Sequence, residues 1–353
     1  MFALCASESS PQASQDGSGE VRDLCARDIS EAHRFLNEAG LYTLSRRLLD
    51  KSLSVYLCLA LLDWTVVVAA TYCAFAVRPA LAIFAILIIG NRQRALGNLL
   101  HDFAHGGFSA HAKRAADFLG TIFLTLPMFT TLKAYRKTHF AHHWFSGSPQ
   151  ADPDYIIDES LACESRHTVF LRYILDRRIW LGNAFGQWRS LTAAERARVA
   201  GWWLSVLSVL AVFVSPQFSI FFASIWTISR FTSFHVITTF REMADHVGMQ
   251  PGALMSYTRN SPLIGFWRPI IHPHNNGLHL AHHLFPRAPF YSLPALHQLL
   301  MIWPKYAGSE HCLGYFGPSV DNGSHALYVF DSFTSPYVDS NAKIGAKGAQ
   351  VLY

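Results

Sequence analysis

Charged residues are scarce in this sequence of 353 residues: Asp, Glu, Lys and Arg make up only 15% of it, against about 25% in a typical soluble chain. This scarcity, with a hydrophobic share of 51%, excludes a disordered protein, a coiled coil and a highly charged nucleic-acid binder. The net charge of +5 is modest, and basic loops beside membrane segments account for it without a nucleic-acid partner. The composition therefore favours a protein with several membrane segments.

Closely spaced cysteines are also missing. The six cysteines form no CxxC pair, so neither a thiolate metal site nor a disulfide framework is expected. Histidine, in contrast, is abundant, with 18 residues. Because neutral imidazole is the commonest metal ligand among side chains, histidine is where a metal site has to be sought.

Four apolar stretches are expected to cross a membrane as two helical hairpins, at 52–99 and 201–240. A crossing helix needs about 20 residues, and residues 52–76 alone supply that length. Residues 215–217, Ser-Pro-Gln, divide the second hairpin. A further apolar stretch, 116–132, is expected to be re-entrant or interfacial, because a full crossing would put the histidines before and after it on opposite membrane faces.

The basic residues indicate the orientation of these hairpins. The turn at 77–79 holds one arginine, and the turn at 215–217 holds neither lysine nor arginine, whereas 133–200 and 241–311 are rich in both. Since cytoplasmic loops carry the excess of basic residues, both chain ends and the histidine-rich segments are expected on the cytoplasmic side of a multi-pass membrane protein.

Three parts of the chain are expected to differ in organisation. Residues 1–45 are polar and are expected to be a disordered N-terminal tail. Residues 46–305 are expected to form the membrane domain, and residues 306–353 an extension to which the sequence gives no role.

Eight histidines fall into three clusters with helical spacing. One cluster is an HxxxH sequence and two are HxxHH sequences, and positions i, i+3 and i+4 share one helix face. Eight imidazoles are too many for one ion, since zinc usually takes four ligands, so two metals fit the count; zinc, copper, iron and nickel all suit imidazole. His246, four residues after Glu242, is a candidate ninth ligand. The clusters are His101 and His105; His139, His142 and His143; and His279, His282 and His283.

The clusters and their flanks resemble the three histidine boxes of the membrane fatty acid desaturase superfamily. The second box lies in YRKTHFAHHWFSGSPQADPD, residues 135–154, and the third box with its tail lies in HNNGLHLAHHLFPRAPFYSLPALHQLL, residues 274–300. REMADHVG, residues 241–248, resembles the segment that carries an additional ligand. The resemblance extends from about residue 50 to residue 305.

This resemblance implies an all-α integral membrane protein with four transmembrane helices and a cytosolic cap that carries a di-iron site. The nine histidines named above would be the ligands, and O₂ would be the co-substrate. Because the chain has no HPGG heme-binding sequence, electrons would come from a separate donor, a ferredoxin or a cytochrome b5 with its reductase. Residues near the ligands are expected to orient their rings or, at Glu242, to hold a metal-bound water. These residues are Glu242, Asp102, Asp152, Asp154, Asn275 and Asn276.

Three functions are compatible with these features. The leading one is desaturation of an acyl chain linked to lipid, carrier protein or coenzyme A. The second is hydroxylation of acyl chains, alkanes or carotenoids by a member of the same superfamily. The third is binding or transport of zinc, which is disfavoured because the clusters lie at or beyond the ends of the apolar stretches rather than within them.

Overall fold

The computed structural model describes residues 16–161, 164–261, 264–312, 314–316 and 328–334. These residues form helices joined by loops, and the pairing between extended segments is limited to the isolated bridges Asn260–His311 and Gly314–Tyr328. The predicted all-α class is therefore confirmed for the described part of the chain.

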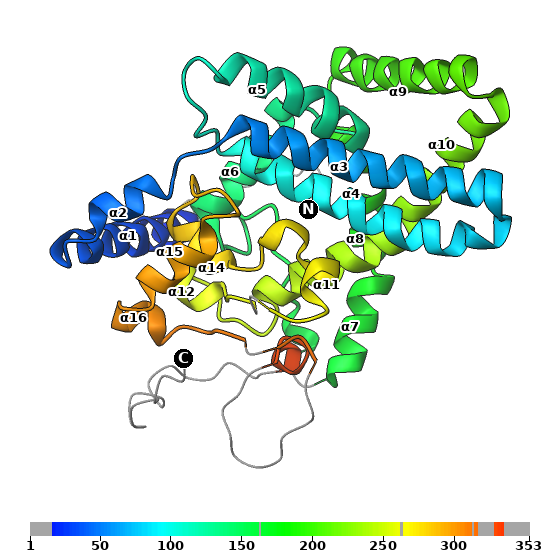
Figure 1. Cartoon of the computed structure of the whole chain (residues 1–353). Coiled ribbons are helices and arrows are strands. Elements are labelled where there is room, and N and C mark those ends of the chain that lie inside the picture. Colours follow the sequence, from blue (N-terminus) through cyan, green and yellow to red (C-terminus); the bar gives the residue numbers. More distant parts are fainter. Residues whose placement is uncertain (1–15, 162–163, 262–263, 313, 317–327, 335–353) are drawn as a thin grey trace.

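The first membrane hairpin consists of two long helices that lie side by side (Figure 1). Helix α3 (Leu53–Tyr72) continues through the π-helix η1 (Cys73–Val77), and the chain turns at Arg78. The short 3₁₀ helix η2 (Pro79–Leu81) then leads into α4 (Ala82–Ala104). Pro79 suits the first position of this helix because the backbone N–H that proline lacks would have no partner within the helix. Each arm, Leu53–Val77 and Pro79–Ala104, is long and apolar enough to cross a bilayer.

Asp63, the one acidic residue in the first span, is fully buried between the two arms and a distant loop. Its Oδ1 accepts a hydrogen bond from Arg92 Nη1 at 2.8 Å, and its Oδ2 lies 2.8 Å from His274 Nε2. A buried carboxylate is tolerated when it is paired in this way. These contacts tie the hairpin to the loop just before the third histidine cluster.

The second hairpin consists of α9 (Ala193–Phe213) and the consecutive helices α10 (Pro216–Phe231) and α11 (Ser233–His246), which are separated by Thr232. It begins eight residues before the predicted position 201 because Thr192 and Glu195 form a capping box that starts α9 at Ala193. The candidate spans are Ala193–Phe213 and Pro216–His246, so the four predicted crossing helices are present.

The helices between the hairpins bend back sharply. Helix α5 (Lys113–Gly120) continues through η3 (Thr121–Thr125) and η4 (Leu126–Met128), and α6 (Leu132–Phe145) then leaves at an angle of 81°. Phe129, between the two arms, has a left-handed backbone with φ of 59°. This bend is the geometry expected of a broken or re-entrant segment, and it brings α6 beside α4.

Large apolar side chains cover the outside of the long helices. Leu62, Ile83 and Phe213 are 54%, 62% and 81% exposed. A soluble surface rarely carries such side chains in a continuous patch, whereas the hydrocarbon of a bilayer accommodates them. The chain is a multi-pass membrane protein.

A helical cap with its own apolar core covers one end of the hairpins (Figure 1). Leu36, Leu280 and Leu296 are fully buried in this core. Part of the N-terminal segment expected to be disordered is helical, because helix α1 (Asp16–Glu38) packs Cys25, Ala32 and Leu36 into the core of the cap. Residues 1–15 lie outside the described part. The remaining helices are α1 (Asp16–Glu38), α2 (Tyr42–Arg47), η5 (Glu159–Leu161), α7 (Arg166–Leu175), α8 (Arg177–Phe185), η6 (Trp188–Ser190), α12 (Leu254–Tyr257), α13 (Arg268–Ile271), η7 (Pro273–Asn275), α14 (His279–Leu284), α15 (Leu293–Leu300), α16 (Pro304–Ala307) and η8 (Asp331–Thr334).

Candidate metal centre

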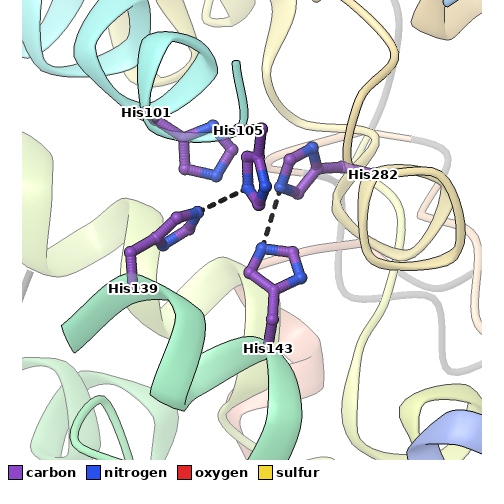
Figure 2. A group of neighbouring side chains, drawn as sticks. All are labelled: His101, His105, His139, His143 and His282. Carbon is purple, nitrogen blue, oxygen red and sulfur yellow. Dashed lines mark hydrogen bonds between the residues drawn. The ribbon is translucent and has the colours of Figure 1, made fainter. Parts of the chain in front are cut away.

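Five histidines from three helical segments converge at the end of the hairpins. One ring nitrogen of each lies within 4.8 Å of one ring nitrogen of every other. Figure 2 shows the rings pointing toward a common centre. His105 Nε2 lies 2.7 Å from His139 Nε2, and His143 Nε2 lies 3.1 Å from His282 Nε2. This five-histidine group consists of His101, His105, His139, His143 and His282.

Four further histidines form a second group beside the first. Their ring nitrogens also lie within 4.8 Å of one another, and all four side chains are buried. His283 Nε2 lies 3.2 Å from His142 Nε2 and 3.1 Å from His279 Nε2. This four-histidine group consists of His142, His246, His279 and His283.

Adjacent histidines in the HxxHH clusters belong to different groups. His142 and His143 lie next to each other on α6, and a rotation of about 100° per residue points them to different sides. The same rotation on α14 separates His282 from His283. The rings of His143 and His283, one from each group, stack with centroids 4.2 Å apart. The two groups are therefore in direct contact.

The geometry of both groups suits a metal ion. Two imidazole nitrogens bound at right angles, each about 2.1 Å from an ion, lie about 3 Å apart, close to the separations found here. A neutral imidazole carries only one N–H, so several ring nitrogens that face one another cannot all form hydrogen bonds among themselves. Within the described residues, His101 Nε2 and His246 Nε2 are buried without a hydrogen-bond partner. These are the nitrogens that an ion would satisfy.

Burial also keeps the ring nitrogens in the form that binds metals. Desolvation, reinforced by neighbouring imidazoles, holds the pKa of His279, His282 and His283 well below 6.5. His105, just beyond the end of α4, has its pKa lowered for the same reasons. These rings are neutral at pH 7, as a metal ligand must be.

Two of the acidic residues expected near the ligands contact a histidine ring. Asp152 Oδ1 lies 2.8 Å from His142 Nδ1, and Asp152 is itself fixed by the backbone N–H groups of Gly147 and Asp154. Asp102 Oδ1 lies 3.4 Å from His101 Nδ1, while its Oδ2 accepts a hydrogen bond from Tyr56 at 2.6 Å. Such contacts fix the tautomer and the orientation of a ligand ring.

Four other expected residues are placed differently. Asn275 accepts a hydrogen bond from Arg268, because its left-handed backbone, with φ of 56°, turns it toward that side chain. Asn276 exchanges hydrogen bonds with Asn98. Glu242 accepts a hydrogen bond from Arg241 at 2.8 Å and, with Asp154, lines a cavity beside the histidines. None of these contacts joins a histidine ring.

Sequence reasoning missed three other neighbours of the histidines. Arg241 Nη2 lies 3.2 Å from His279 Nδ1, and Asp245 Oδ2 lies 3.5 Å from His279 Nε2. The backbone carbonyl of Tyr257 lies 3.0 Å from His246 Nδ1, which directs His246 Nε2 toward the four-histidine group. The spacing of Arg241 and Asp245, four residues apart on the helix that carries His246, is the one available hint for the first two.

Residues 78–313 match the profile of the fatty acid desaturase family, which is two thirds of the chain. The chain belongs to the fatty acid desaturase family. It is therefore an oxidoreductase of the membrane desaturase and hydroxylase superfamily, and its two histidine groups are suited to the metals of such a centre.

Curated relatives within this superfamily act on different molecules. The chain is 27% identical over 267 residues to dihydrorhizobitoxine desaturase of Bradyrhizobium elkanii, a match that covers 69% of this chain and 75% of the relative. It is 24% identical over 201 residues to zeaxanthin 4-ketolase of Chlamydomonas reinhardtii and 26% identical over 206 residues to beta-carotene 4-ketolase of Protosiphon botryoides. These matches cover 56% of this chain in both cases, and 40% and 47% of the two ketolases. Family membership therefore leaves the substrate open.

Proposed function

We propose that the chain is an O₂-dependent desaturase with two iron ions, one in each histidine group, and that the nine histidines are the ligands. The observation that carries this proposal is the contact between the groups, since the rings of His143 and His283 stack at 4.2 Å. Two ions held there would be neighbours. Ligand type alone also allows zinc, copper or nickel, and membership of the desaturase family favours iron.

The iron pair, reduced by an external donor, would activate O₂ for removal of two hydrogen atoms from adjacent carbons of a saturated chain. The protein's own residues prepare the site. Burial lowers the pKa of His279, His282 and His283, so these rings are neutral at pH 7, while Asp152 holds His142 and the carbonyl of Tyr257 holds His246. The helices α4, α6, α11 and α14 carry eight of the nine rings, which helps to place a substrate precisely.

The acyl chain predicted from the sequence is one substrate class for this reaction. By their names, these relatives act on dihydrorhizobitoxine, zeaxanthin and beta-carotene, so members of the superfamily also act on molecules other than acyl chains. Desaturation is favoured as the reaction because the desaturase match covers more of both chains than the ketolase matches do.

Insertion of oxygen is the second candidate, and the two ketolase relatives are the specific observation in its favour. Zinc transport is less favoured. Asp63, the one acidic residue within the first span, is paired with Arg92 and His274, which accounts for its burial without an ion to bind.

A ferredoxin, or a cytochrome b5 with its reductase, is the proposed electron donor. We also propose that both chain ends and the histidine groups lie on the cytoplasmic side. The lysines and arginines of 133–200 and 241–311 support this orientation, and a cytoplasmic donor could then reach the site.

Product analysis tests the proposed reaction. The full chain is expressed in a host without the activity, and lipids and polar metabolites are compared by mass spectrometry with those of a His142→Ala control. Loss of two hydrogens from a metabolite, absent in the control, is expected. Gain of an oxygen atom would establish the second candidate, and a purified protein with zinc and no iron would contradict the proposal.

A further inference from the structure

A small cavity lies directly beside both histidine groups. It has a volume of about 50 Å³, which is room for roughly four water molecules. His101 and His139 of the five-histidine group and His142 and His279 of the four-histidine group line it. A molecule held in this cavity is therefore within reach of both proposed metal positions, and the remaining wall determines which molecule fits.

Arg230, in the last turn of α10, lines this cavity and is 2% exposed. Within the described residues its guanidinium meets no carboxylate at ion-pair distance. The other two arginines of the wall differ, because Arg94 and Arg241 pair with Glu242 at 3.8 Å and 2.8 Å. A buried cation without a counter-ion is costly, and in a membrane span it is a sign of a binding site.

The guanidinium of Arg230 is held in place by uncharged groups. Its Nε donates to the carbonyl of Ala184 at 2.6 Å, and its Nη groups contact the carbonyl and the sulfur of Met128 at 3.3 Å and 3.4 Å. The rings of Phe129 and Phe234 lie 5.2 Å and 4.8 Å from its central carbon. A guanidinium has five N–H donors, of which these contacts use three, so two remain for a ligand.

The backbone around Arg230 is adapted to this position. Gly186 has φ of 56°, and a Cβ there would lie 2.8 Å from the carbonyl of Met128 and 3.3 Å from Arg230 Nη2. Phe129 has the left-handed φ of 59° that non-glycine residues rarely adopt. Strained conformations such as that of Phe129 cluster at ligand sites, and both Phe129 and Gly186 lie against the guanidinium of Arg230.

A buried acceptor without a donor lies next to this arginine. Asn183 directly precedes Ala184, lines the same cavity and is 2% exposed. Its Nδ2 contacts His235 Nδ1 at 3.0 Å and Thr239 Oγ1 at 3.1 Å, while its Oδ1 has no hydrogen-bond partner among the described residues. The cavity thus offers free donors at Arg230 and a free acceptor at Asn183.

We propose that this cavity binds a short amino acid-type substrate, with its carboxylate on Arg230 and its ammonium group on Asn183 Oδ1. The planar fork of arginine matches the two oxygens of a carboxylate, and the amide oxygen accepts from an N–H group. The methylene groups of a long acyl chain would leave both polar groups unsatisfied, which is unfavourable in a buried site. Turnover of this substrate rests on the proposed desaturase function, but its binding does not.

Binding to the iron-loaded full chain in lipid nanodiscs tests the proposal. The probes are L-norvaline, its carboxamide, valerate and oleate, with calorimetry as the readout. L-Norvaline is expected to bind, and Arg230→Gln is expected to weaken it by about 10- to 100-fold, the range for hydrogen bonds to a charged group. Valerate, which lacks the ammonium group, and the carboxamide, which lacks the carboxylate, are both expected to bind more weakly than L-norvaline.

Two further variants control this experiment. Arg92→Gln removes an arginine of α4 that pairs with Asp63 and does not line the cavity, so it is expected to leave L-norvaline binding unchanged. Arg230→Lys keeps the charge but not the fork, and serves as the test if Arg230→Gln does not fold. Iron content is expected to be the same in all variants, since the contacts of Arg230 within the described part of the chain are with Ala184, Met128, Phe129 and Phe234 rather than with the nine histidines.

Equal L-norvaline affinity in the wild type and the Arg230 variants would overturn the proposal, as would tight oleate binding that depends on Arg230 while L-norvaline fails to bind. Binding of L-norvaline without any desaturated product in the presence of a reductase system would count against the proposed reaction on this substrate and leave the binding site intact. The two failures are thus distinguishable.

Discussion

The two histidine groups differ in how deeply their side chains are buried and in how closely neighbouring groups orient their rings. In the four-histidine group every side chain is buried, and two rings are fixed by short contacts, His142 to Asp152 at 2.8 Å and His246 to the carbonyl of Tyr257 at 3.0 Å. In the five-histidine group His105 is only partly buried and lies beyond the end of its helix, and His101 meets Asp102 at 3.4 Å. An ion in the four-histidine group should therefore be bound more tightly and exchange more slowly.

Loss of a ligand from either group should have the largest effect. His142→Ala removes a ring of the four-histidine group, and His282→Ala removes one of the five-histidine group. Each is expected to lower product formation by more than about 100-fold, beyond what changes to orienting residues cause. Metal analysis should show iron per chain falling from two toward one in both variants. Substantial product from either variant, with the protein inserted in the membrane, would show that its group is not part of the active centre.

Loss of an orienting carboxylate should lower the metal affinity of the two groups to different extents. Asp152→Asn is expected to lower metal affinity of the four-histidine group by about 10- to 100-fold, as for other carboxylates that hold a ligand ring. Asp102→Asn is expected to lower that of the five-histidine group by only about threefold, because a contact of 3.4 Å is weak. Iron retention against a graded chelator measures both. Equal losses in the two variants would contradict the proposed difference.

Acid should weaken both groups together. Burial lowers the pKa of His279, His282 and His283 in the folded chain, so below the unfolded value of about 6.5 the unfolded chain binds more protons than the folded one. Stability and metal retention are then fully present above that pH and are lost as the pH falls below it. Thermal unfolding and iron content between about pH 5 and pH 8 check this prediction. A stability that rises toward acid would contradict it.

A substitution in the second hairpin, away from both histidine groups, should leave the difference in metal affinity between the groups unchanged. Thr192→Ala removes the cap of α9, whose hydroxyl accepts from the N–H of Glu195, and is expected to cost about 1 kcal/mol of stability. Iron content and activity should match the wild type below the unfolding temperature. A selective loss of iron from one group would mean that α9 supports that group directly.

The sequence predicts the repeating features of this molecule and misses those set by single contacts. Helical spacing places His142 and His143 on different sides, and the separation of two groups follows from it. Apolar length predicts the four spans, while the start of α9 depends on the local cap at Thr192. Asn275 was expected beside the ligands, but a left-handed backbone turns it to Arg268, and no spacing rule reveals such a turn.

The sequence also does not reveal the role of Arg230, because that role depends on contacts with distant residues. Within an apolar stretch a lone arginine is conspicuous, but its sequence position does not reveal whether a carboxylate faces it. Arg92, also in a span, has such a partner in Asp63, and this pairing joins the two arms of the first hairpin. Partners that meet only through tertiary packing decide between a structural and a binding role.

The most direct test of the two-group centre is an anomalous diffraction map at the iron edge from crystals of the iron-loaded protein. The proposal predicts two peaks in neighbouring positions, one enclosed by His142, His246, His279 and His283, and the other by the five-histidine group. A single peak, or two peaks away from these rings, would contradict it.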